Sequence, residues 1–287
     1  MSAENKTIKE NSSSLDSEGS TCSSKTAAAD GSACSSEATA TDGPACSSKP
    51  TATEGPTWNP SESSEMPVSC PNCGQETSFE IWTILNAQDN PEKAASLAAG
   101  TLTDFTCPHC GFRTILDHPC MFIDPDHKLM VYNVCGYPEM TQQSEDTFAA
   151  LPSMDEVMNS TEFRIVNSMQ ELSDKAAIFA AGYDDRIIEM LKLSVLGYAQ
   201  HQNRIAEDTP CMVSFIESND ERITFHIQTE TEGFTSSMSA ESYEVFAKAL
   251  ESIDKEALVQ ITKVDAGRSA YVVDLEWAYY VLDSISD

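Results

Sequence analysis

The stretch TDFTCPHCGFRT, residues 103–114, contains two cysteines separated by a proline and a histidine. A similar stretch, CPNCG, occupies residues 70–74, so the chain carries two CPxCG motifs. One CxxC motif is enough for a redox enzyme, because its two thiols form the reversible disulfide. A tetrahedral zinc site needs four ligands, which two CxxC motifs supply. The duplication therefore predicts a zinc site whose ligands are Cys70, Cys73, Cys107 and Cys110.

The glycine after each motif, Gly74 and Gly111, favours metal over redox chemistry. A thioredoxin-like CxxC opens a helix whose N-terminus lowers the pKa of the first thiol, and glycine continues a helix poorly. In a metal knuckle the chain turns tightly, glycine permits positive φ, and backbone N–H groups point at the sulfurs. Residues 111–116 are also strand-like. A redox dithiol and a site that has lost its metal remain alternatives.

The spacer between the motifs is long, with 33 residues between Cys73 and Cys107. Short zinc fingers have roughly 15–20 residues there, so additional elements must be inserted. Residues 78–84 alternate as a strand does. Residues 89–100 begin with a capping residue and a proline and end at a glycine, which predicts a helix.

Charge and cysteine usage limit the class of protein. The chain of 287 residues has 46 acidic and 17 basic residues and a formal charge of −29. Such an excess of acid repels phosphate backbones and makes nucleic-acid binding unfavourable. We find neither an 18-residue apolar run nor a hydrophobic N-terminal signal, so we expect a cytoplasmic protein with reduced cysteines and no membrane contact.

The first 66 residues are of low complexity and contain a 12-residue repeat that starts at Cys22, Cys34 and Cys46. Serine, threonine, alanine and glycine bury too little apolar surface to offset the entropy of ordering, so we expect a disordered tail. The alternative, that these three cysteines bind metal or are oxidised, lacks a neighbouring histidine.

The segment after the second motif predicts a hairpin with strands near residues 120–124 and 129–134. We expect Cys120 and Cys135 to be small buried residues in these strands. The nearby histidines are expected at the surface or in turns and not among the ligands; they are His109, His118 and His127.

A polar connector is expected over residues 138–160, followed by a strand at 161–166. Ser168 and Glu171 then form a capping box that opens a helix closed by Gly182. Asp184 and Asp185 open the next helix. We interpret this acidic pair as a helix cap, with a cation site as the less favoured reading.

Residues 206–287 predict a small α+β unit with the order ββαββα. Its expected hairpins are 213–227 and 258–273, and its helices are 243–253 and 275–285. His226 falls on the polar side of its strand with no partner for chemistry, so we do not interpret it as a site.

The chain resembles the CpXC family of bacterial and archaeal proteins over about residues 67–198. The resemblance rests on both motifs, on the spacer, and on the later stretches FRIV and GYDDRIIE; these occupy residues 70–74, 107–111, 89–102, 163–166 and 182–189. The family has no assigned activity, so the resemblance implies metal binding and little more.

The predicted architecture is therefore an α+β protein. A disordered tail (1–66) precedes a zinc-ribbon-like, two-knuckle β domain with an inserted helix and a helical C-terminal part (67–205), and the small α+β domain follows (206–287).

The function favoured by the sequence is a non-catalytic cytoplasmic protein with a structural zinc site of four cysteines that acts by contact with an unknown protein partner. The chain has no GxGxxG, GxxxxGK, HExxH or GxSxG motif, so we do not expect an enzyme. The alternatives are a thiol–disulfide oxidoreductase that uses CPHC and a nucleic-acid-binding zinc ribbon.

Overall fold

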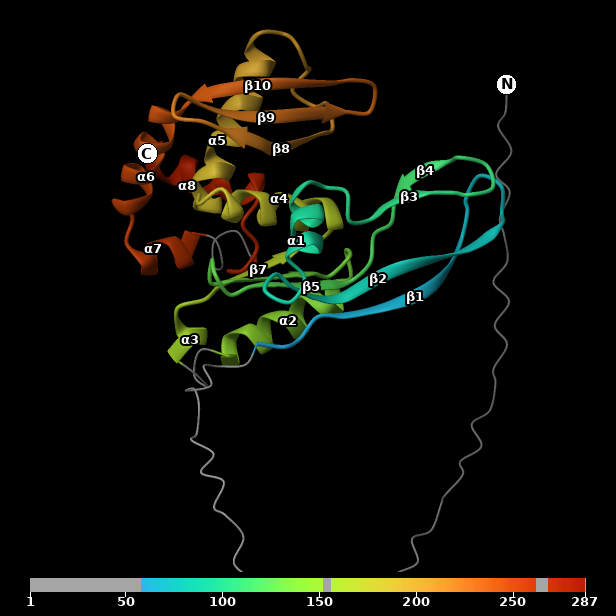
Figure 1. The fold of residues 1–287 in the computed structure, drawn as a ribbon. Helices are drawn as coiled ribbons and strands as arrows, with labels where there is room; N and C mark the ends of the chain where they lie inside the picture. Colours follow the sequence, from blue (N-terminus) through green and yellow to red (C-terminus); the bar gives the residue numbers. More distant parts are fainter. Residues whose placement is uncertain (1–57, 152–155, 262–267, 287) are drawn as a thin grey trace, which may run out of the picture. The chain divides into compact units, whose positions relative to one another are not determined.

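A computed structural model describes residues 58–151, 156–261 and 268–286 of the chain (Figure 1). It has both helices and sheets, which confirms the α+β class. The predicted tail repeats, with Cys22, Cys34 and Cys46, lie outside the described residues.

The larger sheet has five strands in the order β1-β2-β5-β6-β7. The pairs β1–β2 and β5–β6 are antiparallel, whereas β2–β5 and β6–β7 are parallel. The strands are β1 (Glu62–Ser69), β2 (Glu76–Asn86), β5 (Cys120–Asp124), β6 (Leu129–Asn133) and β7 (Glu162–Val166).

Two hairpins carry the two cysteine motifs. The first motif joins β1 to β2, and the second joins β3 (Asp104–Thr106) to β4 (Arg113–Ile115). Only the far end of β2 pairs with β5, so β1 and the near part of β2 extend beyond the helix-covered body, together with β3 and β4 (Figure 1). We call these two hairpins the arm.

Helices cover the larger sheet. α1 (Pro91–Ala98) and α4 (Met169–Ala180) share a core with β2, β5 and β6 that includes Leu85, Leu97 and Leu172. The predicted serine cap forms, because Glu171 N–H donates to Ser168 Oγ at 3.1 Å; the Glu171 carboxylate accepts from the N–H of Asn167, one residue before the cap, at 2.8 Å.

The predicted polar connector, 138–160, is wrong. Residues Pro138–Ala150 form α2, and a short helix, α3 (Glu156–Asn159), follows. The proline at the start of α2 is compatible with a first helical turn, where its missing N–H is not needed. Phe148 of α2 is buried against Phe163 of β7. Met140 and Leu151 pack against the same cluster, so a few apolar residues in a polar segment hold this helix on the sheet.

The smaller sheet has three strands in the order β10-β9-β8: β8 (Cys211–Ser218), β9 (Arg222–Thr229) and β10 (Gly233–Ser239). The predicted order ββαββα is wrong at two points. β10 was missed because its sequence, GFTSSMS, is mostly small and polar. The strand expected from residue 258 begins inside α7 (Lys255–Val259), which Asp254 caps through two hydrogen bonds.

The last part of the chain also differs from the predicted order of strands and helices. Residues 270–273, expected to be a strand, form a turn and an extended connection to α8 (Leu275–Ser286), and residues 262–267 lie outside the described ranges. α6 (Ala240–Glu251) and α8 occur where helices were expected.

A core crosses the boundary predicted at residues 205 and 206. Ile178 of α4 and Ile188 of α5 (Asp185–His201) belong to the same cluster as Val213, Phe225 and Ile227 of the smaller sheet. The tail boundary at 66 also differs, because β1 begins at Glu62. β1 is almost fully exposed, so it lacks the apolar alternation that reveals a strand.

Replacing the capping serine, Ser168→Ala, should lower the free energy of unfolding by about 1 kcal/mol, because it leaves a helix N–H without its acceptor. Urea unfolding gives this value. Ser236→Ala is the control, since its hydroxyl makes none of the hydrogen bonds found in the described residues. Equal urea midpoints for the two variants would contradict the cap's role.

Candidate metal centre

The two motifs fold into equivalent knuckles. Gly74 N–H donates to the Cys70 carbonyl at 2.8 Å, and Gly111 N–H donates to the Cys107 carbonyl at 2.9 Å. Both glycines have positive φ, +69° and +72°, and a Cβ built on either meets nothing within 4 Å. Glycine is therefore required here for its backbone conformation and not for space.

The knuckles bring four sulfurs together. Cys70 Sγ lies 3.7 Å from Cys110 Sγ, and Cys73 Sγ lies 3.7 Å from Cys107 Sγ. All four sulfurs are within 4.8 Å of one another. A tetrahedral zinc with Zn–S bonds of about 2.3 Å places its sulfurs about 3.8 Å apart. The close pairs join opposite motifs, and the four cysteines have the spacing of a group that could hold a metal ion.

The arm has little apolar material besides these cysteines. The cluster around the knuckles has three buried residues, Cys70, Phe105 and Cys107, which are only 1–3% exposed. Phe79 packs edge-on against Phe105, with ring centroids 6.0 Å apart. So small a core contributes little stability, and such arms in proteins usually depend on a metal or a disulfide.

The two less buried thiols, Cys73 and Cys110, have opposite pKa shifts. The pKa of Cys110 is lowered to about 6, first by the Asn72 amide, which donates to its sulfur at 3.5 Å, and then by a backbone N–H. The pKa of Cys73 is raised to about 12: a hydrogen bond from the Gln75 backbone lowers it, but burial and the three neighbouring sulfurs prevail. A thiolate at this separation makes deprotonation of a neighbouring thiol unfavourable, and a bound cation would offset the repulsion between the negative sulfurs.

The other candidate residues lie apart from this group. None of His109, His118 and His127 belongs to it. His118 was expected at the surface or in a turn but is buried, with Nε2 3.1 Å from the Trp82 carbonyl oxygen. Cys120 is buried as predicted. Cys135 is only half-buried and lies in a turn with φ of +53°, so its placement in a strand was wrong.

We compared the chain with known protein families, with curated proteins and with solved structures. The model of the CpXC protein family matches residues 68–192, which include both knuckles and the helices that follow. This segment is therefore similar to the CpXC family. No curated protein and no solved structure matched the chain. Among the described residues, no helix is long and apolar enough to cross a membrane.

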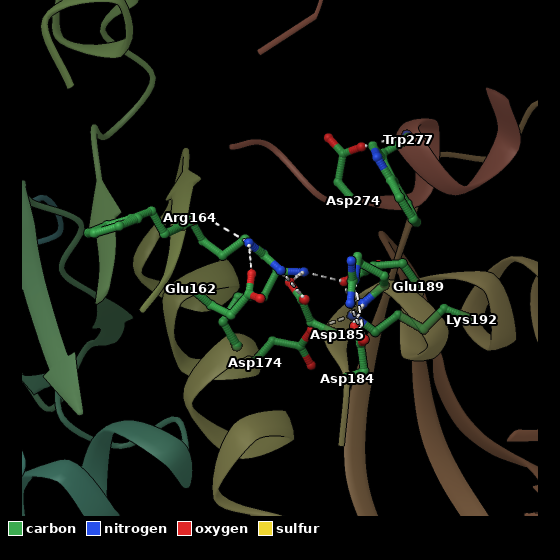
Figure 2. A network of polar contacts seen from close by, with 12 residues as sticks. Glu162, Arg164, Asp174, Asp184, Asp185, Glu189, Lys192, Asp274 and Trp277 are labelled. Carbon is green, nitrogen blue, oxygen red and sulfur yellow. Dashed lines mark hydrogen bonds and ion pairs between the residues drawn. The ribbon is translucent and has the colours of Figure 1, made fainter. Parts of the chain in front are cut away.

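The CpXC segment also contains a buried ion pair that the sequence analysis missed. Arg164 of β7 donates from Nε and Nη2 to the two carboxylate oxygens of Asp185, both at 2.8 Å (Figure 2). Asp185 is 0% exposed. The predicted cap holds for Asp184, whose carboxylate accepts the Arg186 N–H at 2.9 Å, but Asp185 instead ties the first turn of α5 to the larger sheet.

The pair is part of a larger buried network between α4 and α5. Lys175 Nζ lies 3.0 Å from Asp185 and 2.9 Å from Glu189. Lys192 contacts the same Glu189 oxygen at 2.9 Å and also pairs with Asp174. Asp174 in turn accepts the Phe215 N–H of β8 at 2.7 Å. The network thus links the larger sheet, both helices and the smaller sheet.

Burial and neighbouring charges shift the pKa values of these groups in opposite directions. Burial alone would raise the pKa of Asp185, but Arg164 and Lys175 hold it well below the usual range. Burial would lower the pKa of Lys192, but Asp174 and Glu189 raise it. Asp185 and Lys192 are therefore charged at neutral pH. One sign of the network was visible in the sequence: Arg164 stands in the apolar stretch FRIV, where a charge needs a buried partner.

Replacing Asp185→Asn should lower the free energy of unfolding by about 3–5 kcal/mol at pH 7, because Arg164 loses its charged partner inside the protein. The folded-state pKa of Asp185 is depressed, so its contribution is present above the unfolded pKa of about 4 and is lost as pH falls toward the folded pKa. Urea unfolding of both proteins should show the same gap at pH 7 and 5.5 and a smaller gap at pH 3.

The control is Asp283→Asn, an exposed carboxylate on α8. It should leave stability within about 0.5 kcal/mol of wild type. A similar, small loss for both variants would contradict a buried, charged Asp185.

Proposed function

We propose that the chain is a non-catalytic zinc protein in which Cys70, Cys73, Cys107 and Cys110 hold one Zn²⁺ and the arm contacts a protein partner. The observation that supports zinc most strongly is the 3.7 Å separation between sulfurs of opposite motifs. This value is close to the spacing in a tetrahedral zinc site with four sulfur ligands. Thiolate ligands also favour zinc over hard cations such as Mg²⁺ and Ca²⁺.

A structural role fits the arrangement better than a catalytic one. Four protein ligands fill a tetrahedral zinc and leave no position for water or substrate. The metal would cross-link β1–β2 to β3–β4, whose shared core is small. The role of zinc here is thus to fix two hairpins relative to each other.

Exposed apolar side chains on the arm support partner contact. Met66, Phe112 and Ile115 are 46%, 37% and 45% exposed, and all three lie on the strands or knuckles around the cysteines. Large apolar residues at the end of a rigid hairpin are suited to insertion into another protein's surface. The charge of −29 makes a nucleic-acid partner unfavourable.

The oxidoreductase alternative has less support. Each motif forms a turn that leads into a strand, so neither cysteine pair opens a helix that would activate a thiol. The close sulfur contacts found here also join cysteines of different motifs.

Purified protein should contain one zinc per chain, and Cys107→Ser should lose tight zinc binding, because three thiolates and a hydroxyl bind zinc less well. Elemental analysis after gel filtration gives the ratio. Cys211→Ser, a half-buried cysteine on β8, is the matched control and should keep one zinc. Stoichiometric zinc in Cys107→Ser, or equal loss in both variants, would contradict the site.

Removal of zinc by a chelator should accelerate hydrogen exchange in residues 62–82 and 103–116 while α4 and β6 stay protected, because the body has its own cores. Mass spectrometry of the exchanged peptides measures this. If the whole chain exchanges faster, zinc holds the body as well. If no region changes, the arm does not depend on the metal.

The zinc-loaded protein should not accelerate the reduction of insulin by dithiothreitol above the protein-free rate, because metal-bound thiolates are blocked. Turbidity of the insulin B chain follows the reaction. Turnover in wild type that disappears in Cys107→Ser would favour the oxidoreductase instead.

A further inference from the structure

The chain has a cavity of about 430 Å³ that is separate from the cysteine site. It lies against α4 and α5, beside the edge strand β8 and the connection that leads into α8. Its volume falls within the range of small-molecule sites, roughly 300–1,000 Å³. Apolar side chains from four segments form much of its wall: Ile165, Val166, Val213, Val272, Val273 and Leu275.

The charged groups in and beside this cavity form an inner and an outer set, of which Arg164, Asp185 and Arg268 do not themselves line the cavity. The inner set is the buried network, in which three cations balance three carboxylates. Its members are Lys175 and five residues labelled in Figure 2, namely Arg164, Lys192, Asp174, Asp185 and Glu189. The outer set is Glu171, Asp274 and Glu276, against the single cation Arg268. The inner set is therefore neutral, and the outer set has an excess of two negative charges.

The inner set still has hydrogen-bond donors to offer. Lys175 and Lys192 both line the cavity and are 4% and 3% exposed. Each ammonium has three N–H donors, and each contacts two carboxylates. Among the described residues neither ammonium has a third partner, so one N–H of each lysine is available for an acceptor in the cavity.

The backbone of β8 offers a further donor. Phe215 N–H bonds to Asp174 and so points away from β9. Val213 lies two residues earlier in the same antiparallel ladder, so its N–H and C=O also point toward the open edge of the sheet. Val213 lines the cavity, and this edge is where an added polar group can complete the ladder.

We propose that this cavity binds an α-amino acid with an apolar side chain. Its carboxylate accepts from the two lysines and the Val213 N–H, its ammonium pairs with Glu171 and Asp274, and its side chain packs on the apolar wall. Glu171 and Lys175 are one turn apart on α4, so their side chains are neighbours, with Cβ atoms about 5–6 Å apart. That spacing suits a ligand whose ammonium and carboxylate are attached to the same carbon atom.

Ligands of a single charge fit less well. An anion would meet the five carboxylates that line the cavity, and a plain cation would leave the spare lysine donors without an acceptor. The state of Glu171 agrees with this: burial, followed by the charge of Asp274, raises its pKa, and a ligand ammonium would relieve that repulsion.

Calorimetric titration of the full zinc-loaded chain with valine, leucine and phenylalanine tests the proposal. At least one should bind saturably below about 10 mM. Two analogues that lack one charge, 3-methylbutylamine and 4-methylpentanoate, should bind at least about tenfold more weakly than leucine or not at all. If either analogue binds as tightly as leucine, or no amino acid binds, the proposal is wrong.

Glu171→Gln should weaken amino-acid binding by at least about tenfold while the helix cap survives, since glutamine also serves in a capping box. Glu244→Gln, an exposed carboxylate on α6, is the matched control and should bind like wild type. Urea unfolding checks that both variants are folded. Unchanged affinity in a folded Glu171→Gln would overturn the assignment.

Discussion

Four sulfur atoms from two separate hairpins meet within 4.8 Å, and the arm depends on that meeting. Two strands of one hairpin are marginal in water, and β3 and β4 have only three residues each. The buried apolar residues that the hairpins share are few. The proposed metal would join cysteines 34 and 40 residues apart in sequence, and by closing this long loop it would offset chain entropy that the small core cannot. The exposed apolar residues around the knuckles keep a fixed arrangement only if the two hairpins are fixed relative to each other.

A buried network of ion pairs is the second constraint, and it connects the elements of the helix-covered part of the protein. Arg164 enters the sheet at a buried position and needs Asp185 there, while Lys175, Glu189 and Lys192 extend the same balance to the smaller sheet. A hydrophobic replacement of similar shape often matches such networks in stability, so the network alone does not explain why charges occur here. The adjoining cavity suggests one reason: a neutral inner network with spare donors presents polar groups to a ligand and remains stable without one.

The parts that could be predicted from the sequence are those fixed by nearby residues. Glycine with positive φ, two cysteines and a proline define a knuckle locally, and Ser168 with Glu171 defines a helix start. Where a contact between residues distant in sequence determines the local structure, the prediction from the sequence was wrong. α2 is polar but for the residues that reach β7, and β10 is held by its partner β9 and not by an apolar pattern. α7, which Asp254 caps, extends into the start of the stretch that was expected to be a strand. Asp185 resembled a cap because its partner lies 21 residues earlier.

The central claim is that one zinc joins the two knuckles through sulfur alone. X-ray absorption at the zinc edge of the purified protein tests it most directly. The account predicts four sulfur neighbours at about 2.3 Å and no nitrogen or oxygen bound to the zinc. Two or more nitrogen or oxygen neighbours, or the same spectrum from Cys107→Ser, would contradict it.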